Sequence, residues 1–213
     1  MSAITSIIDI FLHLDKHLSL YMNEYGIYIY LILFLIIFCE TGLVFMPFLP
    51  GDSLIFATGA LAAAGSIKAA PIFLIFCVAA IVGDSVNYSI GHFLRDKVAG
   101  RENIRFIKRE YLDRTSEYFD KHGPSTIIIA RFIPIIRTFA PFVAGVGTMP
   151  YRKFISFNAI GGILWVSVAL FAGYFFGNIP FVKDNFSIVI LGIVFVSLLP
   201  VIITFIKNKM ATK

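Results

Sequence analysis

The feature that most constrains this chain is an apolar stretch, residues 125–148, that is hydrophobic enough to enter a bilayer yet contains charges and prolines. Its arginines are Arg131 and Arg137, and its prolines are Pro134 and Pro141. An arginine at the centre of a spanning helix costs about 2.5–3.5 kcal/mol, and each proline removes a backbone donor. Broken backbone survives at membrane depth only where protein or water surrounds it. The stretch therefore predicts a re-entrant hairpin, interrupted at its middle, with both ends on one side of the membrane.

The composition indicates a polytopic membrane protein. The 213 residues are 58% hydrophobic and have a mean hydropathy of +0.86. The net charge of +5 is concentrated in a few segments, which does not favour nucleic-acid binding. Cys39 and Cys77 lie in apolar runs without C-x-x-C spacing, so neither a disulfide nor a metal site is predicted. No nucleophile–base set or cofactor motif is present, so the sequence predicts neither an enzyme nor a cofactor.

The remaining segments complete the expected fold, a single all-α integral membrane domain over residues 1–213. An amphipathic helix is predicted at residues 1–24, where apolar side chains share one face. Transmembrane spans are predicted at residues 71–94, 154–178 and 186–206, and a polar cytoplasmic loop with an amphipathic helix at 95–122.

A second broken apolar stretch, residues 26–70, resembles the arginine stretch in character. Its first span is interrupted by Glu40, and a turn follows that contains Pro47, Pro50 and Gly51-Asp52. This pattern predicts an acidic re-entrant hairpin. Lysine and arginine favour the cytoplasmic side, which places the 95–122 loop and both termini in the cytoplasm. The two hairpins then enter from opposite sides and meet near the bilayer midplane, as in an inverted repeat with a central site.

The charged residues of the two stretches sum to zero formal charge. Glu40 and Asp52 lie on one predicted hairpin, and Arg131 and Arg137 on the other. One interpretation is a neutral latch, because mutual pairing lowers the cost of charge at membrane depth. The other is that the arginines bind a phosphate bidentately, while the carboxylates hold them in the empty site and take up protons.

Two of the predicted helices also have a face of polar or small residues. Asp84, Asn87, Tyr88 and Gly91 form a stripe that must face protein, either as a seam between helices or as a transport lining. A packing face is predicted in the 154–178 span, where Gly173-x-x-x-Gly177 has the spacing of a helix contact. Its other polar or small members are Asn158, Gly161, Gly162 and Trp165.

The order and spacing of these motifs resemble the DedA family of bacterial inner-membrane proteins, within the SNARE-associated group that includes eukaryotic lipid scramblases. The resemblance covers roughly residues 15–207. It rests on Glu40-x-Gly42, Pro47-x-x-Pro50-Gly51-Asp52, Arg131-Phe-x-Pro134-x-x-Arg137-Thr138 with the following stretch to Gly145, and Asn158-x-x-Gly161-x-x-x-Trp165.

The resemblance implies the inverted pair of hairpins and a role in moving lipids across the inner membrane. It places Glu40, Asp52, Arg131 and Arg137 on the family's essential charged positions. The structural motif residues that it implies are Gly42, Pro47, Pro50, Gly51, Pro134 and Gly145, and Asp84, Asn158 and Trp165 are secondary candidates.

The function expected from the resemblance is transport of undecaprenyl phosphate, or a related anionic phospholipid, with proton coupling. Its partners would be that membrane lipid and protons, with no nucleic acid, and the oligomeric state stays open. Two alternatives remain: an ion or proton transporter driven by the proton-motive force, and an assembly factor that transports nothing.

The charge pattern generates a test of topology. A cysteine at Ser66 is expected to react with an impermeant thiol reagent from the periplasm, and one at Ser116 or Thr212 only after the membrane is opened. The unsubstituted chain, with Cys39 and Cys77, provides the background labelling. Periplasmic labelling at Ser116 would contradict the inverted arrangement.

Overall fold

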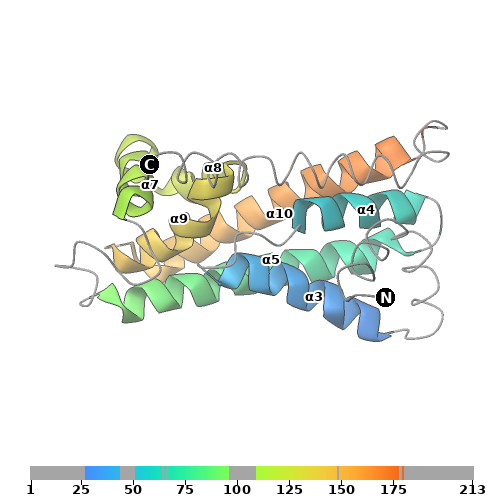
Figure 1. Ribbon diagram of the computed structural model, residues 1–213, viewed down its shortest axis with the longest axis horizontal. Helices are drawn as coiled ribbons and strands as arrows, with labels where there is room; N and C mark the ends of the chain where they lie inside the picture. Colours follow the sequence, from blue (N-terminus) through green and yellow to red (C-terminus); the bar gives the residue numbers. More distant parts are fainter. Residues whose placement is uncertain are drawn as a thin grey trace, which may run out of the picture. The chain divides into compact units, whose positions relative to one another are not determined.

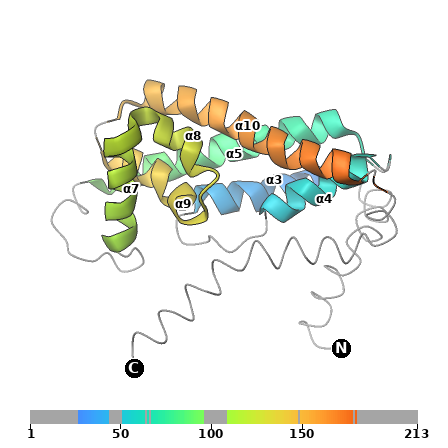
Figure 2. The ribbon, with the colours of Figure 1, turned by 90° about the horizontal axis from the view of Figure 1, so that it is seen from above.

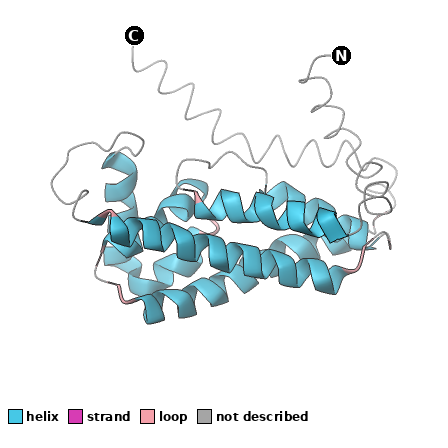
Figure 3. Cartoon of the chain, turned by 90° about the horizontal axis from the view of Figure 1, so that it is seen from below, coloured by secondary structure: helices cyan, strands magenta, loops and turns pink. Residues whose placement is uncertain are grey.

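The computed structural model describes residues 27–43, 51–63, 65, 67–95, 109–147, 149–177 and 179, and every regular element within them is a helix (Figure 1, Figure 3). The helices are α3 (Ile27–Gly42), α4 (Gly51–Ala63), α5 (Ala69–Phe93), α7 (Arg109–His122), the 3-10 turn η1 (Gly123–Ser125), α8 (Thr126–Ala130), α9 (Pro134–Val146) and α10 (Tyr151–Gly177). The predicted helix at 1–24, Pro47, Pro50 and the predicted span at 186–206 lie outside the described residues.

Two of the described helices, α5 and α10, are long and apolar enough to cross a membrane, at 25 and 27 residues. Large apolar side chains such as Leu74 and Val78 on α5, or Ile163 and Leu164 on α10, remain exposed. Exposed apolar side chains are expected where a helix faces lipid rather than water. These helices confirm the all-helical class, while the inverted repeat of two re-entrant hairpins stays a prediction.

The chain divides into two compact units. Of the described residues, unit 1 contains those up to Leu33, those from Pro50 to Leu74 and those from Ser167 onward, and unit 2 contains the remainder. Helices α3, α5 and α10 contribute residues to both units.

In unit 1, α4 packs closely on the last turns of α10. A Cβ added to Gly173 would collide with the backbone of Phe56, and one added to Gly177 would meet Ala60. The glycine spacing predicted a helix contact, and the structure confirms it, because small residues let two backbones approach at membrane depth.

In unit 2, Pro134 explains where the arginine stretch is broken. Helix α8 ends at Ala130 and α9 begins at Pro134. A residue before proline avoids the helical region, and Ile133 is extended, with φ −119° and ψ 107°. Proline is tolerated at the first helical position because its missing N–H would have no partner there. Pro141 lies inside α9 without ending it. The break was predicted at the middle of the stretch, but it falls before the middle, at residues 131–133.

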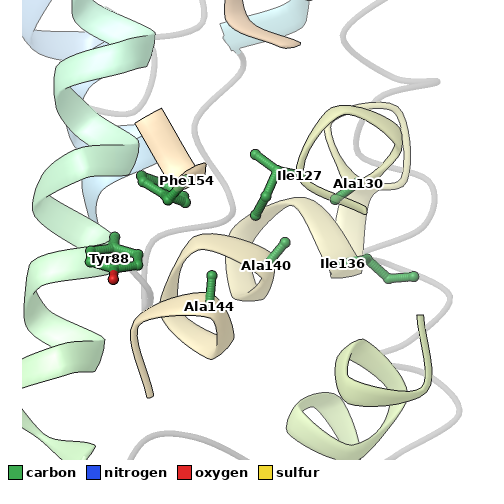
Figure 4. Packing of buried hydrophobic residues seen from close by; sticks show 7 residues of the cluster. All are labelled: Tyr88, Ile127, Ala130, Ile136, Ala140, Ala144 and Phe154. Carbon is green, nitrogen blue, oxygen red and sulfur yellow. The ribbon is translucent and has the colours of Figure 1, made fainter. Parts of the chain in front are cut away.

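A cluster of buried apolar side chains packs α8 and α9 against α5 and α10 within unit 2 (Figure 4). Ile136, Ala140 and Ala144 recur at every fourth position of α9 and therefore share one face. Tyr88 of α5 and Phe154 of α10 stack with ring centroids 4.5 Å apart. Helix α7 covers the other side of α8 and α9 (Figure 2).

Helices α5 and α9 come into close contact at two glycines. A Cβ on Gly91 would collide with the carbonyl oxygen of Phe142, and one on Gly145 would collide with that of Tyr88. Each helix therefore presents a glycine to the backbone of the other, and any larger residue would force them apart.

This close approach generates a prediction of stability. Gly145→Ala is expected to destabilise the protein by about 1–3 kcal/mol, because its methyl group has no room against Tyr88. The measurement is the apparent melting temperature of the purified protein in detergent. Ser89→Ala, at an exposed position on α5, serves as the control. Equal melting temperatures for the two variants would show that the helices are not in close contact.

Candidate functional site

The two arginines of the broken stretch lie in unit 2, and the more buried of them is Arg131, in the break after α8. Its Nη2 donates hydrogen bonds to Asp84 Oδ2 at 2.6 Å and to Asn158 Oδ1 at 2.5 Å. The Asn158 amide is oriented in turn, because its Nδ2 donates to the carbonyl of Ile81 at 3.0 Å. Segments far apart in the sequence, α5 and α10, therefore hold the same guanidinium group.

Two adjacent glycines of α10 make room for that guanidinium group. A Cβ on Gly161 would lie 3.2 Å from the Nε of Arg131, and one on Gly162 would lie 3.3 Å from its Nη2. Both distances are shorter than an unstrained contact, so glycine lets α10 approach the arginine. The Nε itself is buried and has no hydrogen-bond partner within the described residues.

Arg137, in the first turn of α9, belongs to a second ion pair. Its Nη2 donates to Glu40 Oε1 of α3 at 2.6 Å. The guanidinium carbon also lies 4.4 Å from the ring centre of Trp165, and that of Arg131 lies 5.8 Å from the same ring. A tryptophan face attracts cations, so the indole of Trp165 stabilises both arginines at once.

Asn87 of α5 holds the backbone beside this second pair. Its side-chain nitrogen donates to the carbonyls of Thr41 at 3.1 Å and Thr138 at 3.0 Å. These residues directly follow Glu40 and Arg137 in the chain. Asn87 is fully buried, so its two hydrogen bonds fix how far apart the two charged residues are held.

The structure brings together some of the sequence-predicted residues and pairs them differently. Arg131, Arg137 and Glu40 all lie in unit 2, but the acid that pairs with Arg131 is Asp84. Asp52 lies in unit 1, near the start of α4, so its pairing with an arginine stays a prediction.

The sequence contained a signal for the missed pair. Asp84 is a third carboxylate within the apolar segments, yet the charge balance counted only Glu40 and Asp52. The predicted stripe on α5 does face protein, since Asp84 and Asn87 are both buried. Asn87 was not among the predicted site residues, although its place one turn after Asp84 could have suggested it.

Three of the predicted structural motif residues lie at helix contacts or helix starts. Gly42 lies against the backbone of Gly83 on α5, Gly51 begins α4, and Pro134 begins α9. Among the described side chains, no group of three or more His, Cys, Asp or Glu residues lies close enough together to hold a metal. The arginine cluster itself consists of paired charges and hydrogen bonds.

Comparison with known proteins identifies the family. The model of the VTT domain matches residues 49–175. Protein DedA of Escherichia coli K12 is 51% identical over 213 residues, which is 99% of this chain and 97% of that protein. The chain belongs to the DedA family.

Other relatives of this DedA-family chain are named as membrane proteins. An uncharacterized membrane protein of Mycobacterium leprae is 47% identical over 168 residues, covering 79% of this chain and 75% of the relative. Inner membrane protein YghB of Escherichia coli K12 is 36% identical over 157 residues, covering 74% and 72%. No solved structure matches the chain. Family membership and the apolar helices together establish a membrane protein.

The ion pair between Arg131 and Asp84 generates a prediction that compares the loss of one charge with the loss of both. Asp84→Ala is expected to destabilise this DedA-family protein by about 3–5 kcal/mol, because it leaves a buried guanidinium group without its counter-charge. The neutral double variant Asp84→Asn, Arg131→Gln should recover most of that loss. The measurement is thermal unfolding in detergent, with Ser85→Ala on the same helix as control. A double variant no more stable than Asp84→Ala would contradict the pairing.

Proposed function

We propose that this protein moves a lipid with an anionic phosphate headgroup across the inner membrane. The proposed cargo is undecaprenyl phosphate, with a related anionic phospholipid as the alternative. One observation carries the proposal: two arginines lie in and just after a helix break, each paired with a carboxylate, and Trp165 lies against both. A guanidinium group is the side chain best suited to bidentate phosphate binding.

The two arginines differ in how exposed their side chains are. The side chain of Arg137 is 11% exposed, whereas that of Arg131 is 3% exposed. Arg131 also donates to both Asp84 and Asn158. Because Arg137 is the more exposed of the two, it is the group that exchanges its carboxylate for a phosphate, with the positive charge of Arg131 nearby.

Binding of a phosphate to Arg137 releases Glu40 from its ion pair. A carboxylate released at membrane depth favours taking up a proton, because burial penalises its charged form. Inward movement of one negative charge against the membrane potential costs about 2.3 kcal/mol per 100 mV. A proton carried on Glu40 or Asp52 cancels that charge, which couples the lipid to the proton gradient.

The lipid tail does not need a polar path. Helices α5 and α10 leave many apolar side chains exposed, so a polyprenyl tail can stay in the bilayer while only its headgroup crosses the protein. The proposal retains the topology expected from the sequence, with cytoplasmic termini and two hairpins that enter from opposite sides of the membrane.

A second candidate is an ion or proton transporter. It is favoured by the buried carboxylates Glu40 and Asp84, because ionisable groups inside a membrane commonly form proton relays. Proton flux in liposomes without any carrier lipid would distinguish it. An assembly factor that transports nothing is the remaining alternative, and it predicts no flux of either kind.

The test is a proteoliposome assay with undecaprenyl phosphate. Exposure of its headgroup is measured with an impermeant probe that recognises the phosphate. Arg137→Lys is expected to abolish movement, since a lysine is a point charge and cannot make the bidentate contact. Arg152→Lys, the same change at an exposed position at the start of α10, should leave the rate unchanged.

Two other outcomes of these liposome assays would each exclude a part of the proposal. Full activity of Arg137→Lys would remove the phosphate-binding role and leave the pair with Glu40 as a latch. Proton flux without the lipid, together with no lipid movement, would favour the ion transporter.

A further inference from the structure

A second site lies in unit 2, outside the arginine cluster. A pocket of about 670 Å³ opens between the last turns of α5 and the start of α10. Its lining includes Tyr88, His92, Arg95, Met149 and Tyr151, and none of the residues of the arginine cluster. The volume is in the range of small-ligand sites.

The floor of this pocket is held in place by several contacts. Tyr88 is buried, and its hydroxyl donates to the carbonyl of Met149 at 2.5 Å. Its ring stacks on Phe154 at 4.5 Å and lies parallel to that of His92 at 6.3 Å (Figure 4 shows Tyr88 and Phe154). The pocket is therefore preformed, because α5 and α10 both fix its base.

The charge of the pocket suits an anion. Its lining contains the basic residues Arg95 and His92 and, among the described residues that form it, no aspartate or glutamate. The guanidinium group of Arg95, beside apolar walls, attracts an anionic headgroup more strongly than it would in open water.

An apolar groove continues from the pocket along α5. This groove is shallow and open, with a volume of about 540 Å³, and it shares Ser89 and Phe93 with the pocket. The rest of its lining is mainly aliphatic and includes Val82, Val86 and Ile90. A cationic pocket joined to an apolar groove is complementary to a molecule with a charged head and a hydrocarbon tail.

The position along α5 agrees with a headgroup site. Arg95 follows Asp84 by 11 residues. Helix α5 ends at Phe93, about 14 Å along its axis from Asp84, and Arg95 lies two residues further, so the distance is close to half of a hydrocarbon core about 30 Å thick. If Asp84 and its arginine lie near the midplane, Arg95 lies at the membrane surface. Tyr151, Arg152 and Lys153 are all exposed at the adjoining start of α10, which is typical of an interface.

We propose that the pocket and groove bind one anionic phospholipid, with its phosphate at Arg95 and His92 and a chain along α5. The occupant is a membrane lipid rather than free phosphate, because the mainly aliphatic lining of the groove is complementary to a hydrocarbon tail, which free phosphate lacks. Its role, as the docking position from which a lipid enters or leaves the arginine cluster, rests on the proposed function. Binding itself does not, and it is measured separately.

The test is native mass spectrometry of the full chain in detergent, titrated with phosphatidylglycerol or phosphatidylcholine. Arg95→Gln is expected to weaken phosphatidylglycerol binding about fivefold, because one basic residue near an anionic headgroup contributes about 1 kcal/mol. Lys153→Gln removes the same charge from an exposed position outside the pocket lining and should change binding less than twofold. An equal loss of phosphatidylglycerol binding in the two variants would show a general attraction to basic surface residues, and the proposed site would be rejected.

A second pair of variants tests the groove. Ser89→Trp places a bulky ring where pocket and groove meet, and should weaken phosphatidylglycerol binding at least as much as Arg95→Gln. Ser156→Trp makes the same change at an exposed position of α10 outside both linings and should have no effect. Unchanged binding in Ser89→Trp would overturn the groove as the tail site.

Two further measurements distinguish a free-phosphate site from a lipid site, and failure of the lipid site from failure of the transport proposal. Inorganic phosphate in millimolar excess should not displace phosphatidylglycerol, and full displacement would show a free-phosphate site instead of a lipid site. Binding that depends on Arg95 in a protein that moves no lipid would support the site and reject the transport proposal. Transport with no dependence of binding on Arg95 would reject the site and leave the transport proposal intact.

Discussion

Arg131 can be buried in unit 2 because contacts from other segments offset each cost of its burial. Asp84 supplies the counter-charge, Asn158 accepts a second hydrogen bond, and Gly161 with Gly162 leaves space for the guanidinium group. Since these residues lie on α5 and α10, one side chain in the break after α8 determines how both long helices must face it. A change to any of these contacts leaves a charge or a polar group buried without compensation.

The second ion pair, between Arg137 and Glu40, is positioned by the end of the same break. Pro134 ends the break and starts α9, so Arg137 lies in the first turn of that helix. Asn87 then ties the backbone beside Arg137 to the backbone beside Glu40, and Trp165 lies against both guanidinium groups. The two pairs thus share α5 and α10 as a common scaffold.

Helix α5 connects the two proposed lipid positions within unit 2. Asp84 and Asn87 lie in the charged cluster, Tyr88 and His92 follow over the next turns of α5, and Arg95 lies two residues beyond its end; the last three line the pocket. One face of a single helix therefore runs from the buried ion pairs to a cationic pocket. A lipid headgroup that follows this face would pass from Arg95 at the pocket to the guanidinium groups of the cluster, whose charges are balanced by Asp84 and Glu40.

The sequence alone determined the all-helical membrane class, because long apolar runs have few other stable forms. It also determined the presence of a break, since Pro134 imposes an extended residue before it, and it showed that the charged residues must face protein. It could not decide which carboxylate pairs with Arg131. By charge and segment, Asp52 and Asp84 were equivalent candidates, and close glycine contacts such as that of Gly145 set how the helices pack. Only the tertiary structure decided the pairing, because it depends on the rotation of helices that are distant in sequence and are positioned by side-chain packing.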